Sequence, residues 1–175
     1  MPERRTHREA PVAGERLTRR AALATGFAGA AVLALGAVPA RARGASEGEA
    51  LTELIRAEED AVFVYTQARL DGAAALAPQD TEHAKALASH LEGLGMPVPG
   101  PTRGRDDLAP EALAVLEATG AQARRRAAMA YERSLIDGCL QRLPRFEAPN
   151  TVRTVATVMA SHAQHLVLHE LIGRG

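Results

Sequence analysis

The stretch GMPVPGPTRGRDDLA, Gly95 to Ala109, determines how the segments on either side of it are connected. Proline and glycine end helices, whereas the flanking segments are rich in Ala, Leu, Glu and Arg, which favour helix. At about 3.3 Å per residue, these 15 residues can span roughly 45 Å, the length of a helical bundle. The stretch is therefore too long for a tight hairpin and predicts a crossover.

The flanking sequence predicts four helices. Ser46 and Glu49 have the spacing of a capping box, and the helix that they begin runs to about Ala75. The second helix is expected from about Pro78 to Gly93, the third from about Pro110 to Arg142, and the fourth from about Pro149 to Gly173. Within each half the connection is short, so each pair should be antiparallel. We expect an all-α fold, a four-helix bundle with one long crossover between the second and third helices.

Residues 1–42 resemble an export signal of the twin-arginine type. The pair Arg19 and Arg20 precedes an uncharged run from Ala21 to Ala40, and a small-x-small cleavage pattern follows at residues 40–42. Cleavage there leaves residues 43–175 as one bundle domain, exported to the periplasm, the cell envelope or the outside. The alternative is an uncleaved anchor with membrane association, because 20 uncharged residues approach the length that spans a bilayer.

The composition of residues 43–175 narrows the possible partners. This part of the chain has 14 Lys and Arg against 18 Asp and Glu, a net charge of −4. The sequence shows no basic face, which argues against nucleic acid as a partner. Cys139 is the single cysteine of the chain, which excludes an intramolecular disulfide, and we expect it to be a small buried apolar residue.

Polar residues interrupt the apolar stripe that each helix of a bundle needs. At heptad-like spacing, the inward polar positions are Glu58, Asp80, His83, Glu132, His162 and His165. Asp80 and His83 are three residues apart, as are His162 and His165, so each pair shares one helix face. Glu59 and Asp60 are expected on a solvated face. Tyr65 fits either core packing or a hydrogen-bond donor to the inward polar groups.

This set resembles the ligands of the ferritin-like superfamily. There, one Glu comes from each of two helices and a Glu-x-x-His pair from each of the other two. The corresponding residues, in order, are Glu58, Asp80-x-x-His83, Glu132 and His162-x-x-His165. The segments AEEDAVFVY, DTEHAKALASHLEGLGMPVP and SHAQHLVLHELIG are also similar to small, often exported bacterial ferritin-like proteins. The resemblance covers residues 50–173 and implies that these six residues bind a divalent metal, with iron expected first and manganese or zinc as alternatives.

Two departures from the superfamily pattern bear on how many ions are bound. Asp80 and His162 both stand where the pattern has Glu, and the second of these Glu residues bridges two metals. Four carboxylates would neutralise two divalent ions, whereas this chain supplies three, with three neutral imidazoles. A neutral imidazole has one free lone pair and cannot replace a bridge. We therefore expect a single metal or an unequal pair.

Two functions follow from these residues. The first is an exported ferritin-like protein with a redox or metal-handling role, for which enzymatic activity and oligomeric state stay open. The second is a metal-free binding or structural module of the cell envelope, in which protonated His162 or His165 pairs with Glu58 or Glu132. His90 and His169 lie seven residues beyond proposed ligands and are expected outside the ligand set or at the bundle ends.

Overall fold

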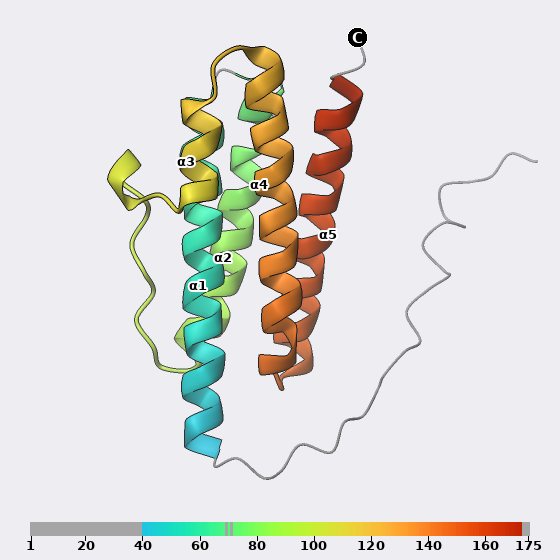
Figure 1. The fold of residues 1–175 in the computed structure, drawn as a ribbon. Coiled ribbons are helices and arrows are strands. Elements are labelled where there is room, and N and C mark those ends of the chain that lie inside the picture. Colours follow the sequence, from blue (N-terminus) through green and yellow to red (C-terminus); the bar gives the residue numbers. More distant parts are fainter. Residues whose placement is uncertain (1–39, 69, 71, 173–175) are drawn as a thin grey trace, which may run out of the picture. The chain divides into compact units, whose positions relative to one another are not determined.

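The computed structural model describes residues 40–68, 70 and 72–172, and this part of the chain contains helices and no β-strand (Figure 1). The α-helices are α1 (Ala40–Gln67), α2 (Ala77–Gly93), α3 (Pro110–Glu117), α4 (Ala121–Arg142) and α5 (Pro149–Ile172). The predicted all-α class is confirmed. The Arg19–Arg20 pair and nearly all of the uncharged run lie outside the described residues. Among the described helices, none is long and apolar enough to cross a membrane.

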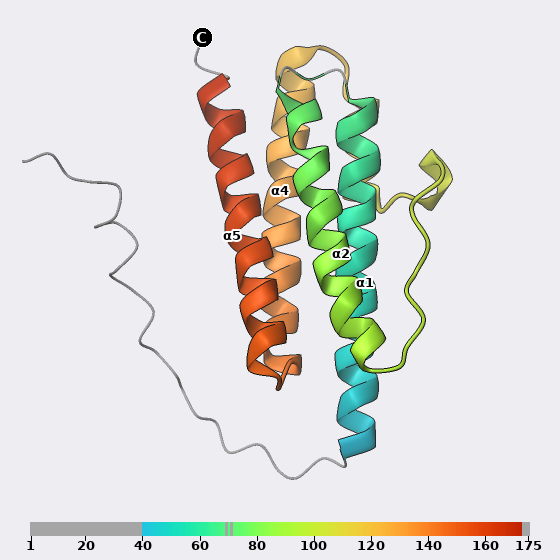
Figure 2. The same ribbon diagram turned by 180° about the vertical axis from the view of Figure 1, so that it is seen from behind.

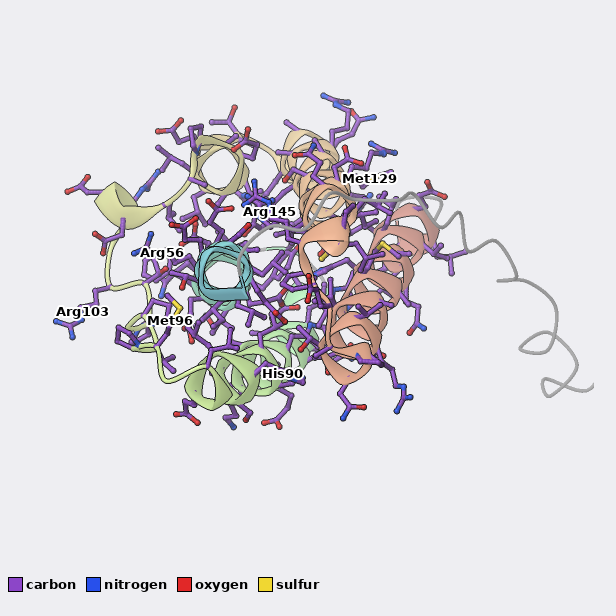
Figure 3. The ribbon with its side chains drawn as sticks, turned by 90° about the horizontal axis from the view of Figure 1, so that it is seen from below. Arg56, His90, Met96, Arg103, Met129 and Arg145 are labelled. Carbon is purple, nitrogen blue, oxygen red and sulfur yellow. The ribbon has the colours of Figure 1, made fainter. Side chains whose placement is uncertain are left out.

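Four long helices lie side by side. α1 packs against α2 and α4 packs against α5, while α2 also contacts α5 and α1 contacts α4. In Figures 1 and 2, α1 and α5 run in one direction and α2 and α4 in the other, so each of these four helices is antiparallel to the long helices that it contacts. The view along the helices in Figure 3 shows the crossover on the side of α1 that faces away from α5, and α3 beside both α1 and α4.

The predicted crossover is present between α2 and α3. The chain leaves α2 through Gly95, whose φ of +71° is in the left-handed region that glycine tolerates, and then runs beside α1 (Figure 1). Two hydrogen bonds fasten it to Asp60 of α1: Thr102 Oγ1 donates to Oδ1 at 2.6 Å and the Ala109 amide donates to Oδ2 at 3.1 Å. Asp60 is consequently buried, and its expected place on a solvated face is wrong.

The predicted third helix is two helices. α3 ends at Glu117 and α4 begins at Ala121, with Gly120 between them at a φ of +84°. The chain reverses at this break, so that α3 and α4 run in opposite directions and α3 packs on both α4 and α1 (Figure 1). The prediction of one continuous helix was wrong because Gly120 has a positive φ, which does not occur inside a right-handed α-helix.

The first helix also differs from its predicted bounds. α1 begins at Ala40 and ends at Gln67, and the short 3-10 turn η2 (Ala73–Ala75) stands where the helix was expected to end. Ser46 lies inside α1, so the predicted capping box is wrong. Gly72, at a φ of +78°, precedes η2 and turns the chain toward α2.

Two apolar clusters fill the interior at different heights along the helices. One contains Val64, Tyr65 and Leu76, and the other contains Ile55, Leu87 and Val158, each with further residues around it. On α1, the fourth residue after Leu54 is Glu58, which falls between the two clusters. The layer between them is where the inward polar residues lie.

Candidate metal centre

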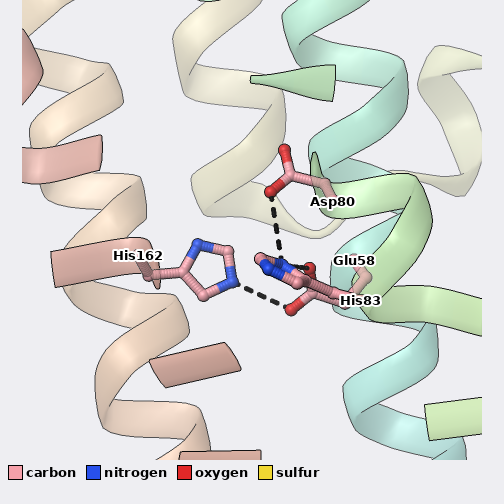
Figure 4. A group of neighbouring side chains, drawn as sticks. All are labelled: Glu58, Asp80, His83 and His162. Atoms are coloured by element: carbon pink, nitrogen blue, oxygen red, sulfur yellow. Dashed lines mark hydrogen bonds and ion pairs between the residues drawn. The ribbon is translucent and has the colours of Figure 1, made fainter. Parts of the chain in front are cut away.

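The six residues predicted from the sequence come together between the apolar clusters. Glu58 comes from α1, Asp80 and His83 from α2, Glu132 from α4, and His162 and His165 from α5. Five of them are buried, and the His83 side chain is 13% exposed. Figure 4 shows four of the side chains pointing toward one another from three helices. Their role as metal ligands stays a prediction.

His162 stands at the middle of the group, with a carboxylate on each ring nitrogen. Its Nε2 lies 2.9 Å from Glu58 Oε1, and its Nδ1 lies 2.9 Å from Glu132 Oε2. A carboxylate oxygen accepts, so both ring nitrogens donate and the ring is an imidazolium. Burial lowers the pKa of His162, but the hydrogen bonds with Glu132 and Glu58 outweigh it and raise the pKa to about 10.

Glu58 and Glu132 are ionised partners of this ring. Burial raises the pKa of both, but their hydrogen bonds with His162 outweigh it, so that the pKa of Glu58 is lowered and that of Glu132 falls to about 2. His83 Nδ1 adds a contact of 3.1 Å to Glu58 Oε2. Tyr65 donates its hydroxyl to Glu132 Oε1. Tyr65 thus has both of the roles that its sequence position allowed, because it donates to Glu132 and also packs in an apolar cluster.

Asp80 is fully buried, and neither of its carboxylate oxygens has a hydrogen-bond partner among the described residues. Its Oδ1 lies 3.7 Å from His83 Nδ1 and 3.8 Å from His165 Nδ1, which is too long for a hydrogen bond. Burial and the charge of Glu58 raise its pKa to about 7. A buried polar group without a hydrogen-bond partner costs about 1–3 kcal/mol of stability, so the lack of a partner at Asp80 needs an explanation.

His165 has one ring nitrogen fixed and the other free. Its Nε2 lies 3.0 Å from Gln79 Oε1, an acceptor, so the Nε2 carries the proton. In neutral His165 the Nδ1 lone pair then faces the interior, 3.4 Å from Glu132 Oε1, and it has no hydrogen-bond partner among the described residues. Gln79 was missed from the sequence, where its place next to Asp80 was a weak signal. Its contact is the kind that orients a metal-binding histidine.

The six side chains fall into two groups that share His162. Glu58, Asp80, His83 and His162 offer ligand atoms that all lie within 4.8 Å of one another, as do those of Glu132, His162 and His165. Carboxylate oxygen and imidazole nitrogen are the donors that iron, manganese and zinc accept in proteins. Each group could hold a metal ion.

The remaining candidates lie outside these groups. His90 contacts two side chains of α5, Thr154 at 2.9 Å and Thr151 at 3.3 Å, and so ties α2 to α5. His169 is buried with its ring 5.9 Å from that of Tyr65, and burial lowers its pKa. Cys139 is buried as predicted, and burial raises its pKa to about 12.

A cavity of about 370 Å³ lies beside the centre. Residues of α1 and α4 line it, and Glu58, Asp60 and Tyr131 are among them. Glu58 is a member of the first ligand group and also borders this cavity, which is large enough for several water molecules.

A comparison with solved structures finds a neighbour for this fold. A crystal structure of a conserved hypothetical protein, rv2844, from Mycobacterium tuberculosis is similar with a TM-score of 0.63, over 74% of this chain and 92% of that chain. The two sequences are 14% identical, so the likeness shows the fold alone. Neither the family models nor the curated proteins contain a match to this chain.

Proposed function

We propose that the protein is an exported, ferritin-like four-helix bundle that binds a divalent metal in its core and serves a redox or metal-handling role. The observation that carries the proposal is Asp80, a fully buried carboxylate whose two oxygens have no hydrogen-bond partner among the described residues. A cation beside it would satisfy both Asp80 and the free Nδ1 of His165.

The arrangement of the helices supports the ferritin-like part of the proposal. Bundles of that superfamily have one long crossover and carry metal ligands on inward faces of all four helices. Here α1, α2, α4 and α5 are the long helices, the crossover joins α2 to α3, and the polar side chains come from all four long helices. Export rests on the sequence of residues 1–42, with its arginine pair, uncharged run and cleavage pattern.

The donor set favours iron, with manganese or zinc as alternatives, because it combines three carboxylates with three imidazoles. A bound iron or manganese ion supplies a redox couple. The chain holds the ligands in position: Gln79 fixes the ring of His165 through Nε2, and Tyr65 donates to Glu132. Both contacts leave the opposite ligand atoms facing the interior.

Metal analysis of the purified protein without a histidine tag tests the proposal, with Asp80→Asn as the decisive variant. We expect iron, manganese or zinc in the native protein and a loss of more than about tenfold in Asp80→Asn. Asp60→Asn is the matched control, because Asp60 is also buried but binds the crossover. Metal-free native protein, or unchanged metal in Asp80→Asn, would overturn the proposal.

One observation favours the second function, a metal-free binding or structural module of the cell envelope. His162, as an imidazolium, already forms an ion pair with both Glu58 and Glu132 and offsets part of their charge. If this network has replaced a metal, a chelator leaves the melting temperature unchanged. A fall of many degrees on chelation would exclude the metal-free module, because only a ligand of the folded state raises the melting temperature in this way.

A further inference from the structure

We propose that His162 joins two metal ions, one bound through each ring nitrogen, and that Asp80 lies between them. This inference rests on the proposed metal-binding function and specifies its site as dinuclear. It replaces the expectation from the sequence that a histidine at this position limits the centre to a single ion or an unequal pair.

The two faces of His162 have matching surroundings. On the Nε2 side, Glu58 lies 2.9 Å from the ring and 3.1 Å from His83 Nδ1. On the Nδ1 side, Glu132 lies 2.9 Å from the ring and 3.4 Å from His165 Nδ1. Each ring nitrogen therefore faces one carboxylate and one further imidazole. The first set comes from α1 and α2, and the second from α4 and α5.

Asp80 has the position that a shared carboxylate needs. Its Oδ1 is nearly equidistant from the two outer imidazoles, 3.7 Å from His83 Nδ1 and 3.8 Å from His165 Nδ1. Both of its oxygens lack a hydrogen-bond partner among the described residues. A carboxylate has two oxygens and about four lone-pair sites, so it can serve an ion on each side.

The spacings suit ligands that surround an ion. Nitrogen and oxygen ligands lie about 2.1 Å from such a metal, so neighbouring ligand atoms are about 3.0–3.5 Å apart at the usual angles between bonds. The contacts between Glu132 and His165 at 3.4 Å, and between Asp80 and His83 at 3.7 Å, are near this range and too long for good hydrogen bonds. Small side-chain movements would bring both groups to ligand spacing.

Charge balance also favours two ions. The buried carboxylates of Glu58, Asp80 and Glu132 supply three negative charges. When His162 binds through both nitrogens, its two N–H bonds are replaced by two N–metal bonds and both protons leave to solvent. The ring is then an imidazolate with one negative charge and two donor lone pairs. Four negative charges balance two divalent ions, with no change in oxidation state.

The test uses Cu²⁺ as a probe, because it has one unpaired electron and accepts imidazole and carboxylate ligands. The full-length protein is stripped of metal with a chelator, loaded with Cu²⁺ and separated from unbound Cu²⁺. Its copper content and its electron paramagnetic resonance spectrum are then measured. We expect two Cu²⁺ per chain with a strongly reduced signal, because an imidazolate couples the spins of the two ions that it joins. In His162→Gln we expect at most one Cu²⁺ per chain, with the full signal of an isolated ion.

His90→Gln is the matched control, since His90 is a histidine of α2 that contacts threonines outside both ligand groups. It should keep two coupled ions. One Cu²⁺ per chain in the native protein, or two without coupling, would overturn the bridge while leaving the proposed function in place. No bound copper, with no other metal bound on isolation, would overturn both. The native protein alone decides these outcomes if His162→Gln fails to fold.

Discussion

Asp60 and Asp80 are both buried aspartates, and their surroundings differ completely. Asp60 accepts hydrogen bonds from Thr102 and Ala109 of the crossover, one on each oxygen. Asp80 lies in the central layer, and neither of its oxygens has a hydrogen-bond partner among the described residues. Burial of a carboxylate is therefore no sign of function in itself. The partners decide, because a satisfied carboxylate holds the fold together and an unsatisfied one needs a cation or a proton.

The largest effect should be a pH dependence that arises in the central layer of the metal-free protein. Folding raises the pKa of His162 from 6.5 to about 10 and that of Asp80 from 3.8 to about 7. The folded state therefore binds these protons more tightly, and stability falls as pH rises. At 1.36 kcal/mol per pKa unit, His162 should contribute about 5 kcal/mol to the free energy of unfolding. This contribution is fully present below pH 6.5 and is lost by about pH 10.

Urea unfolding of chelated protein at a series of pH values measures this loss. Asp80 should add a loss of about 4 kcal/mol between pH 3.8 and about 7, by the same conversion. With metal bound, the trend should reverse, because the ligands must release protons before they bind. A metal-free stability that rises from pH 6 to 9 would contradict the assigned imidazolium.

Substitution of the two aspartates should change stability in opposite directions. Asp60→Ala leaves the Thr102 hydroxyl and the Ala109 amide without their acceptor, which should cost about 3 kcal/mol. Asp80→Asn removes an uncompensated buried charge, so the metal-free protein should gain about 1–3 kcal/mol at pH 8 and little at pH 5. Denaturant unfolding in chelator measures both variants. If both substitutions destabilised the protein equally, Asp80 would not differ from Asp60 as an unsatisfied carboxylate.

Gln79→Leu should weaken metal binding without changing the fold. The variant loses the hydrogen bond that fixes the His165 ring, and such partners of metal ligands contribute about 10–100-fold in affinity. Competition with a chelator of known affinity measures the change. Gln67→Leu serves as a control, because Gln67 is the exposed last residue of α1 and belongs to neither ligand group. An unchanged affinity in Gln79→Leu would mean that His165 takes no part in binding.

The smallest effect should come from Thr102→Val, which removes one of the two donors to Asp60. We expect a loss of about 1–2 kcal/mol, because the Ala109 amide still contacts the carboxylate. Metal content should stay unchanged, since the crossover contributes no residue to either ligand group. Unfolding and metal analysis of the same preparation test both halves of this expectation. A loss of metal would show that the two regions are coupled.

The sequence predicted the features that depend on local pattern. The spacing of Asp80 and His83 and of His162 and His165 placed both pairs on inward faces, and the prolines and glycines after α2 predicted the crossover. Asp60 was placed wrongly because a segment some 40 residues further along covers it. The break at Gly120 was missed because a single glycine within a helical pattern does not by itself end a helix.

The arrangement inside the centre was beyond the sequence for a related reason. The ring of His162 contacts Glu58 from α1 and Glu132 from α4, and this double contact depends on how three helices pack. Helical spacing gives the face on which a side chain lies but not the partner of each ring nitrogen. The inward position of His162 could be predicted, whereas its two-sided contact could not.

The anchor at Asp60 also bears on the order of folding. α1 with α2, and α4 with α5, are hairpins of short sequence separation, whereas Asp60 meets Thr102 and Ala109 only after a long loop closes. Contacts that close long loops tend to form late, so the hairpins should be largely built in the transition state before the crossover is attached. Loss of this anchor should then speed unfolding and leave the folding rate nearly unchanged. The contacts between the crossover and Asp60 would thus set the unfolding rate, and with it the lifetime of the native state.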